Sequence, residues 1–192
     1  MFNAFHKDIM RVRPFFNSKE LPSIFLFLLT PGLQAMLAYR LGFWLRCNDW
    51  HGIMMPFFLL SFFLFWILTA FIRIAYNICL DQSAVIGSGL IIHHFGGIWL
   101  SNCQVGDNCT IHQQVCIAPA VGSILGPLIG NNVWIGPHVK IIGRLKVGDN
   151  STIGAGSIVT RDVDEGCLVI GSPARVIKKK FNNSRILGIA DI

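Results

Sequence analysis

A six-residue repeat in the second half of the chain restricts its fold more than any other feature. A branched aliphatic residue returns at this interval, and a glycine follows it at six of twelve positions. The twelve positions are Ile86, Ile92, Ile98, Val105, Ile111, Ile117, Ile129, Ile135, Ile141, Val147, Ile153 and Val159. A fixed short period is typical of solenoids, in which each repeat packs only on its neighbours. The repeat therefore predicts a three-sided coil of about 18 residues per turn, with the aliphatic side chains stacked inside.

Phenylalanine and glycine divide the chain into two regions near Asp81. Thirteen of the 15 Phe residues lie in residues 1–80, whereas 16 of the 19 Gly residues lie in residues 81–192. We therefore expect a hydrophobic helical region at 1–80 that associates with a membrane or oligomerises. The β-coil follows at 81–180, and a C-terminal tail at 181–192 ends the chain.

The N-terminal region contains two long runs without charge, Leu21–Tyr39 and Gly52–Ile72. As a helix the second run is about 31 Å long, enough for a bilayer core. It is apolar on all sides, so it must be buried in protein or in lipid. Three arrangements fit: a transmembrane hairpin, a monotopic insertion with Leu33–Arg46 as an interfacial helix, or an oligomer interface. In the monotopic arrangement the residues at headgroup level are Arg40, Trp44, Arg46 and Trp50. We favour membrane association by partial insertion, because Pro31-Gly32 interrupts the first run.

Charge and cysteine usage narrow the partners and the compartment. The net charge is +6, yet charged residues make up only 14% of the chain, well below the quarter typical of soluble domains. No nucleic-acid-binding motif accompanies the basic excess, so no nucleic acid partner is expected. The six cysteines show neither a C-x-x-C pair nor the spacing of a secreted disulfide framework, which predicts reduced thiols. The expected location is the cytoplasmic face of the inner membrane, with the cytoplasm as the alternative.

Four stretches of the coil carry motifs of a known family. Residues 90–98 read LIIHHFGGI and residues 105–111 read VGDNCTI. Residues 153–159 read IGAGSIV and residues 171–175 read GSPAR. Together they resemble the serine acetyltransferase branch of the hexapeptide-repeat acyltransferases. The resemblance implies a left-handed parallel β-helix and acetyl transfer from acetyl-CoA to a hydroxyl group. It also implies a homotrimer, and it leaves open whether trimers pair.

Several positions depart from the family pattern where an amino-acid substrate is held. The Asp that precedes the catalytic His is His93 here, the orienting Asp falls on Cys79, and the Arg-His pair of the Gly-rich loop reads Leu125-Gly126. Free serine brings two charges, and burying them unpaired costs several kcal/mol. We therefore predict a neutral sugar hydroxyl of a cell-surface polysaccharide (capsule, lipopolysaccharide or exopolysaccharide) as the acceptor, with a lipid-linked glycan as one form.

Two other functions remain open. The first is serine O-acetylation for cysteine biosynthesis, which the terminal Asp191-Ile192 favours, because the tail of the resembled family also ends in Ile. The second is a non-catalytic β-helix scaffold at the membrane.

His94 is the predicted general base. O-acyl transfer requires removal of a proton from the attacking hydroxyl, and histidine titrates near neutral pH. His93 and His112 each follow an inward residue of adjacent coils, so we expect them near His94, where they contact the acceptor together with Gln113. The alternative for these residues is simple packing at a subunit seam. The spacing of His94, His112 and His138 matches no three-histidine zinc pattern, so no metal is expected.

The predicted cofactor surface is a ladder of small residues. Pro119, Pro137 and Ala155 are 18 residues apart, which predicts that they stack at one corner of successive coils, with rungs about 4.8 Å apart. The resemblance places coenzyme A along such positions, between neighbouring subunits. Basic side chains near the C-terminus are suited to its phosphates. The expected cofactor-binding residues are Pro119, Pro137, Gly154, Ala155, Arg175 and Lys178. We expect direct transfer in a ternary complex, without a covalent enzyme intermediate.

Overall fold

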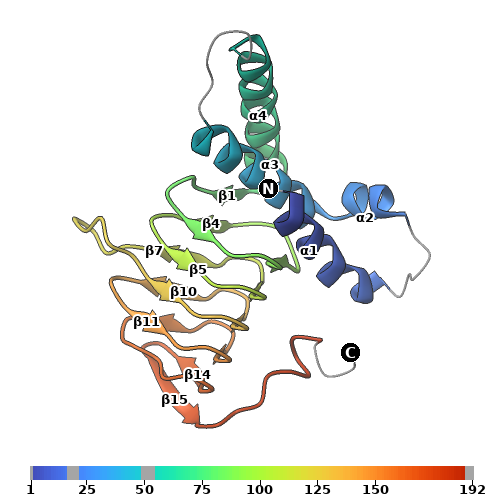
Figure 1. The fold of residues 1–192 in the computed structure, drawn as a ribbon. Coiled ribbons are helices and arrows are strands. Elements are labelled where there is room, and N and C mark those ends of the chain that lie inside the picture. The colour runs from blue at the N-terminus through green and yellow to red at the C-terminus, as the bar shows by residue number, and fades with distance from the viewer. Residues whose placement is uncertain (1, 17–21, 49–54, 189–192) are drawn as a thin grey trace.

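The N-terminal helices and a β-solenoid follow one another in the computed structural model, which describes residues 2–16, 22–48 and 55–188 (Figure 1). Trp50, Asp191 and Ile192 lie outside the described residues. The helices are α1 (Phe2–Val12), α2 (Ser23–Leu29), α3 (Pro31–Cys47) and α4 (Met55–Tyr76), with a 3-10 turn at Arg13–Phe16 after α1. The first strand begins at Ile78, three residues before the boundary predicted from composition.

Three sheets form the sides of the solenoid. The first contains β1 (Ile78–Leu80), β4 (Ile98–Leu100), β7 (Cys116–Ala118), β10 (Lys140–Ile142) and β13 (Ile158–Val159). The second contains β2 (Val85–Ile86), β5 (Gln104–Val105), β8 (Leu128–Ile129) and β11 (Lys146–Val147). The third contains β3 (Ile91–Ile92), β6 (Thr110–Ile111), β9 (Trp134–Ile135), β12 (Thr152–Ile153), β14 (Leu168–Gly171) and β15 (Ala174–Lys178). All strand pairs are parallel except β14 with β15, so the predicted parallel coil is confirmed.

The branched residues of the repeat point inward and stack from coil to coil. In the second sheet Ile86, Val105 and Ile129 are in register and buried. One position differs from the prediction: Leu100, and not Ile98, is in register with Ile117. Strand β4 is three residues long and buries both of its ends, so Leu100 joins the column although Ile98 is the residue that keeps the six-residue spacing.

Side chains of α1 and α3 satisfy the backbone of the first coil, which has no preceding coil to bond to. Arg40 donates to the carbonyl of Ile86 at 2.6 Å and to that of Gly87. Asp8 accepts from the N–H of Gly89 at 2.6 Å. The two side chains form a buried ion pair at 3.3 Å. Both helices therefore cap the end of the solenoid that carries β1.

This capping corrects the prediction that Leu33–Arg46 is an interfacial membrane helix. Most of α3 is buried, including Leu33 and Met36 at 2% and 0% exposure. Arg40 is paired with Asp8 inside the protein and does not lie at headgroup level. The apolar side chains of α3 cover the end of the solenoid. A helical pattern in the sequence shows that such side chains exist, but not which surface they cover.

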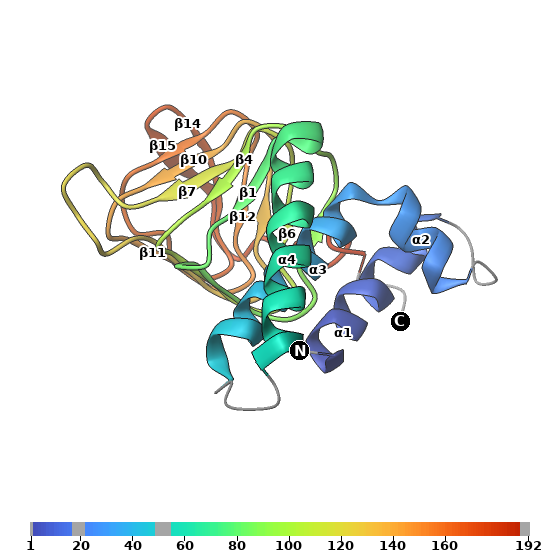
Figure 2. The same cartoon turned by 90° about the horizontal axis from the view of Figure 1, so that it is seen from above.

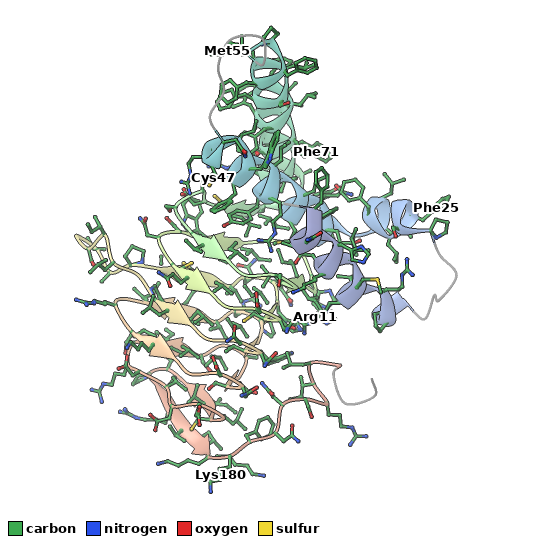
Figure 3. All side chains as sticks on the ribbon, viewed as in Figure 1. Arg11, Phe25, Cys47, Met55, Phe71 and Lys180 are labelled. Atoms are coloured by element: carbon green, nitrogen blue, oxygen red, sulfur yellow. The ribbon has the colours of Figure 1, made fainter. Side chains whose placement is uncertain are left out.

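Helix α4 has a different environment, since its first half projects beyond the capped end of the solenoid (Figures 1 and 2). Met55 lies at its outer tip, and Lys180 lies at the opposite end of the molecule (Figure 3). Among the described helices α4 alone is long and apolar enough to cross a membrane, with a mean hydropathy of 2.3.

The C-terminal segment runs back along the solenoid toward α1 (Figure 1). The side-chain amide of Asn183 donates to the carbonyl oxygens of Asn132 at 2.8 Å and Ser151 at 3.2 Å. Arg11 donates to the carbonyl of Leu187 at 3.4 Å and to that of Gly89 at 2.6 Å. The two ends of the chain therefore meet beside the first coils.

Candidate active site

Three histidines gather at the corner between the third and first sheets. His93 and His94 follow β3, and His112 follows β6 one coil later. The rings of His93 and His112 stack with centroids 5.0 Å apart, and the ring of His94 lies 6.2 Å from that of His112. The register of β3 on β6 produces this cluster, as expected from sequence. The catalytic and substrate-binding roles of the three residues stay predictions.

Trp134 belongs to this cluster, although sequence reasoning missed it. Its ring centroid lies 4.7 Å from that of His112. Trp134 is in register with Thr110, so knowledge of the strand register is the only signal that places it there. The Nδ1 atom of His112 lies 3.0 Å from the carbonyl oxygen of Ile135. Since a carbonyl only accepts, Nδ1 carries the proton and Nε2 is left as an acceptor.

Burial keeps two of the three imidazoles neutral at working pH. Desolvation lowers the pKa of His93 to about 4, and the neighbouring His112, His94 and Arg11 add to the effect. Burial also lowers the pKa of His112, against the opposing effect of its hydrogen bond to Ile135. His94 is exposed. The exposed imidazole is therefore the one that a reacting hydroxyl can reach from solvent.

Cys79 occupies the position at which the resembled family carries an orienting Asp. It lies in β1, in register with Trp99. Burial raises the pKa of its thiol, even though Arg73 opposes the shift. A neutral thiol supplies no negative charge to an imidazole, so His94 does not receive the carboxylate support that the family pattern implies.

Gln113 stands at the next position of the same corner. Its side-chain Oε1 is buried and has no hydrogen-bond partner among the described residues. Its carbonyl accepts from the N–H of His138 at 3.0 Å, and the carbonyl of Pro137 accepts from Gly156 at 2.8 Å. The column at this corner is therefore Gln113, Pro137 and Ala155.

This column corrects the predicted stack of Pro119, Pro137 and Ala155. Pro119 follows β7 and lies at the corner between the first and second sheets, where Gly143 donates to the carbonyl of Ala118 at 3.1 Å. The loop between β7 and β8 lengthens that coil, so the 18-residue spacing crosses from one corner to another. Pro137 and Ala155 do lie at the corner of the histidines.

The surface beside this column fits an extended chain such as pantetheine. Ala155 and Gly156 are exposed, and a Cβ added at Gly156 meets nothing within 4 Å. Gly154 is buried, and its N–H already donates to the carbonyl of Val169 at 2.8 Å, so it offers no free donor. Gly154 therefore contributes only its small size to this surface.

The remaining predicted cofactor residues, Arg175 and Lys178, are exposed on β15. Their cationic ends are available to phosphate groups. Among the described residues no group of three or more His, Cys, Asp or Glu side chains is placed to hold a metal ion.

Comparison with known proteins agrees with this geometry. Residues 126–161 match the family model for bacterial transferase hexapeptide (six repeats). A serine acetyltransferase of Helicobacter pylori is 32% identical over 79% of this chain and 84% of its own length. A serine acetyltransferase of Synechococcus elongatus is 33% identical over 77% of this chain. This chain spans 57% of the length of the Synechococcus relative.

Solved structures extend the likeness to the fold. Serine acetyltransferase of Brucella abortus superimposes with a TM-score of 0.75 and 26% identity, over 94% of this chain and 70% of the other. The same protein has been solved in complex with coenzyme A, and this structure gives a TM-score of 0.72. The predicted left-handed parallel β-helix with a helical leader is thereby confirmed.

Proposed function

The chain belongs to the serine acetyltransferase family of hexapeptide-repeat acyltransferases, and from this premise we propose that it transfers the acetyl group of acetyl-CoA to the hydroxyl of L-serine. The observation that carries the proposal is the exposed His94 beside two neutral imidazoles, at the corner that also holds the open Ala155–Gly156 surface. The expected class of enzyme, an acyltransferase with acetyl-CoA as cosubstrate, agrees with relatives of that name, one of them solved with coenzyme A.

The predicted polysaccharide acceptor was wrong. Relatives that are 32% and 33% identical over more than three-quarters of this chain are serine acetyltransferases, which supports the alternative stated from sequence. The earlier inference relied on missing charge partners at Cys79, His93 and Leu125-Gly126. If a neighbouring copy contributes to the lining of this corner, missing partners at three positions of one protomer do not decide the class of acceptor.

In the proposed reaction His94 removes the proton from the serine hydroxyl as the oxygen attacks the thioester carbonyl. The C–O bond forms, the tetrahedral intermediate collapses, and the C–S bond breaks. The departing thiolate takes the proton from His94, which restores the neutral base. A positioned base of this kind contributes about 10²- to 10⁴-fold to the rate. No protein nucleophile is required, and the products are O-acetylserine and free coenzyme A.

Gln113 is proposed to help hold serine. Its buried Oε1 is an acceptor without a donor among the described residues, and a buried acceptor left unpaired costs about 1–3 kcal/mol. An ammonium group supplies the missing donor. His93 and His112 complete the acceptor side of the corner as neutral hydrogen-bonding groups, because the pKa of each is lowered.

Acetyl-CoA is proposed to lie with its pantetheine arm along Pro137 and Ala155 and its phosphates toward Arg175 and Lys178. The thioester it brings supplies the acyl group. The protein's contribution is to present a flat corner without large side chains, so that the arm can approach the backbone closely. The two basic residues attract the charged end of the cosubstrate.

We propose that the protein is a homotrimer in which a neighbouring copy completes this site. The loop between β7 and β8 projects from the solenoid and exposes Val121 fully and Ile124 at 84%. Apolar side chains at a loop tip are typical of contact surfaces. The molar mass from sedimentation equilibrium tests the proposal, and a monomer at working concentrations would contradict it.

The test of the activity uses the purified full chain with L-serine and acetyl-CoA. Release of free thiol and formation of O-acetylserine, identified by mass spectrometry, are both expected. D-serine and a mixture without acceptor are the controls, and His94→Ala is the matched variant. Thiol release that does not depend on L-serine would overturn the proposed acceptor. Binding of coenzyme A without any turnover would instead favour the scaffold.

A further inference from the structure

The surface of α4 is apolar around most of its circumference. One narrow stripe of side chains faces α3 and the first coil; it consists of Phe58, Ser61, Phe65, Leu68, Thr69, Ile72 and Tyr76, all buried or half-buried. The exposed large apolar side chains are Met55, Phe57, Leu59, Leu60, Phe62, Phe63, Leu64, Trp66, Ile67, Phe71 and Ile74. Of the most apolar 18 residues of α4, only 6% are buried.

This distribution fits lipid better than a protein partner. A packed helix buries one stripe of side chains against each neighbour. A bilayer covers every side of a helix at once, and α4 is apolar on every side that the protein leaves uncovered. We propose that α4 inserts into a lipid bilayer as a monotopic anchor.

The contacts of α4 exclude a full crossing. Phe65, midway along the helix, lies against α3, since a Cβ added at Gly42 would come within 2.5 Å of its ring. The same ring lines a cavity together with Gln82, a residue of the solenoid's first turn. If α4 spanned the membrane, the turn at Gln82 would lie at the centre of the hydrocarbon, where unsatisfied polar groups are not tolerated.

The free surface of α4 is the side of the helix that faces away from α3, along most of its length. The first turn projects past the capped end of the solenoid (Figure 3), but Phe58 and Phe62 line a cavity together with Leu45 and Arg46 of α3. A helix with one long apolar side is suited to lie in the membrane interface, with that side buried about 5–10 Å into the boundary between headgroups and acyl chains.

The charges near α4 agree with an anionic surface. Arg46 lies beside Phe58 and Phe62, and Arg73 lies in the last turn of α4; both are exposed. Residues 1–80 contain seven Lys and Arg but three Asp and Glu. Basic residues at a helix that lies in the interface are attracted to anionic lipids. Since acetyl-CoA is made inside the cell, the cytoplasmic face of the membrane is the side that serves the proposed activity.

The experiment is flotation of the full chain with vesicles of phosphatidylethanolamine and phosphatidylglycerol, without detergent. Wild-type protein is expected to float with the vesicles. The variant Leu60→Gln/Phe63→Gln/Ile67→Gln removes three outward side chains and should lower the floating fraction at least about tenfold. The matched control, Val176→Gln/Ile177→Gln, removes exposed apolar side chains from β15, at the other end of the solenoid, and should float like wild type. Wild-type protein that does not float with the vesicles, or a triple variant that floats as well as wild type, would overturn the proposal.

Two further readouts separate lipid insertion from its rivals. If α4 binds a second copy, the triple variant will have a lower molar mass in sedimentation without lipid, and that result also counts against the proposal. For depth, Met55→Cys is introduced with Cys47→Ser, and a membrane-impermeant maleimide is enclosed in the vesicle lumen before the protein is added outside. A helix that stays in the outer leaflet leaves this thiol unlabelled. Labelling from the lumen would show a full crossing and would overturn the monotopic arrangement. These readouts do not use turnover, so they stand apart from the proposed activity.

Discussion

The ring of Tyr76 lies 5.6 Å from the ring of Phe95, which joins the last residue of α4 to the residue that follows His94. On its other side Tyr76 meets Phe71 edge to face at 5.5 Å. A continuous line of aromatic rings therefore connects the apolar surface of α4 with the turn that carries the proposed base.

Removal of the Phe95 ring should lower turnover. Phe95→Ala takes away the contact that restrains the turn beside His94, and small displacements of a catalytic group cost about ten- to a hundredfold in rate. Steady-state kinetics of the variant should show a lower kcat with little change in KM for acetyl-CoA. Tyr76→Phe keeps the ring contact and is the control. An unchanged kcat in Phe95→Ala would show that the contact has no influence on the base.

Loss of the base should be more severe and should leave the protein folded. His94→Ala is expected to lower kcat by about two orders of magnitude or more. Because His94 is exposed, its replacement should leave the melting temperature and the binding of coenzyme A close to those of wild type. Stopped thiol-release assays and calorimetry measure both. A fall in kcat counts for catalysis only where the variant stays folded. Full activity of His94→Ala would exclude His94 as the general base.

The pKa of His93 predicts how stability depends on pH. The folded protein holds this pKa at about 4, whereas an unfolded chain has a histidine pKa of about 6.5. Between these values the unfolded state binds the extra proton, so the free energy of unfolding should fall as pH drops from 6.5 to 4. Urea titrations at several pH values in this range should show that the free energy of unfolding of His93→Gln depends less steeply on pH, by at most about one proton. His6→Gln, on the exposed part of α1, is the control and should keep the wild-type slope.

The buried ion pair between Asp8 and Arg40 should be costly to break. Asp8→Asn leaves the Arg40 charge without its partner inside the protein, and such changes cost about 3–5 kcal/mol. Urea unfolding measures the difference. Asp164→Asn, which alters an exposed carboxylate of the solenoid, should change the free energy of unfolding by less than about 0.5 kcal/mol. Equal effects of the two substitutions would mean that the pair is not needed to hold α1 on the first coil.

A large side chain at Ala155 should impair the cosubstrate and spare the fold. Ala155 is exposed at the corner of Pro137, so Ala155→Trp should fold normally while obstructing the proposed path of the pantetheine arm. The KM for acetyl-CoA is expected to rise by about tenfold or more, whereas Ala155→Ser should leave it near the wild-type value. A normal KM in Ala155→Trp would show that acetyl-CoA binds at another corner of the solenoid.

The sequence was most informative where one coil repeats the next. The order of the inward residues placed Ile86, Val105 and Ile129 in one column, since every third inward residue returns to the same side of the solenoid. Counting residues along the chain failed at Pro119, because an inserted loop changes the count without interrupting the inward pattern. It also left Trp134 outside the site, since its position beside His112 depends on register and not on spacing along the chain.

The packing of the leader was harder to predict for a different reason. Asp8 and Arg40 are 32 residues apart and meet only because both helices close the same end of the solenoid. A helical pattern shows that α3 has apolar side chains but not what they cover. Helix α4 differs, because its apolar surface extends farther around the helix than the neighbouring elements reach.

The first coil of a solenoid offers a row of unbonded peptide groups, and an uncovered row of this kind invites another molecule to continue the sheet. Here the guanidinium of Arg40 and the carboxylate of Asp8 occupy those groups. Growth of the protein into end-to-end fibres is thus opposed at this end by two side chains of opposite charge, and loss of the helical leader would expose the unbonded row again.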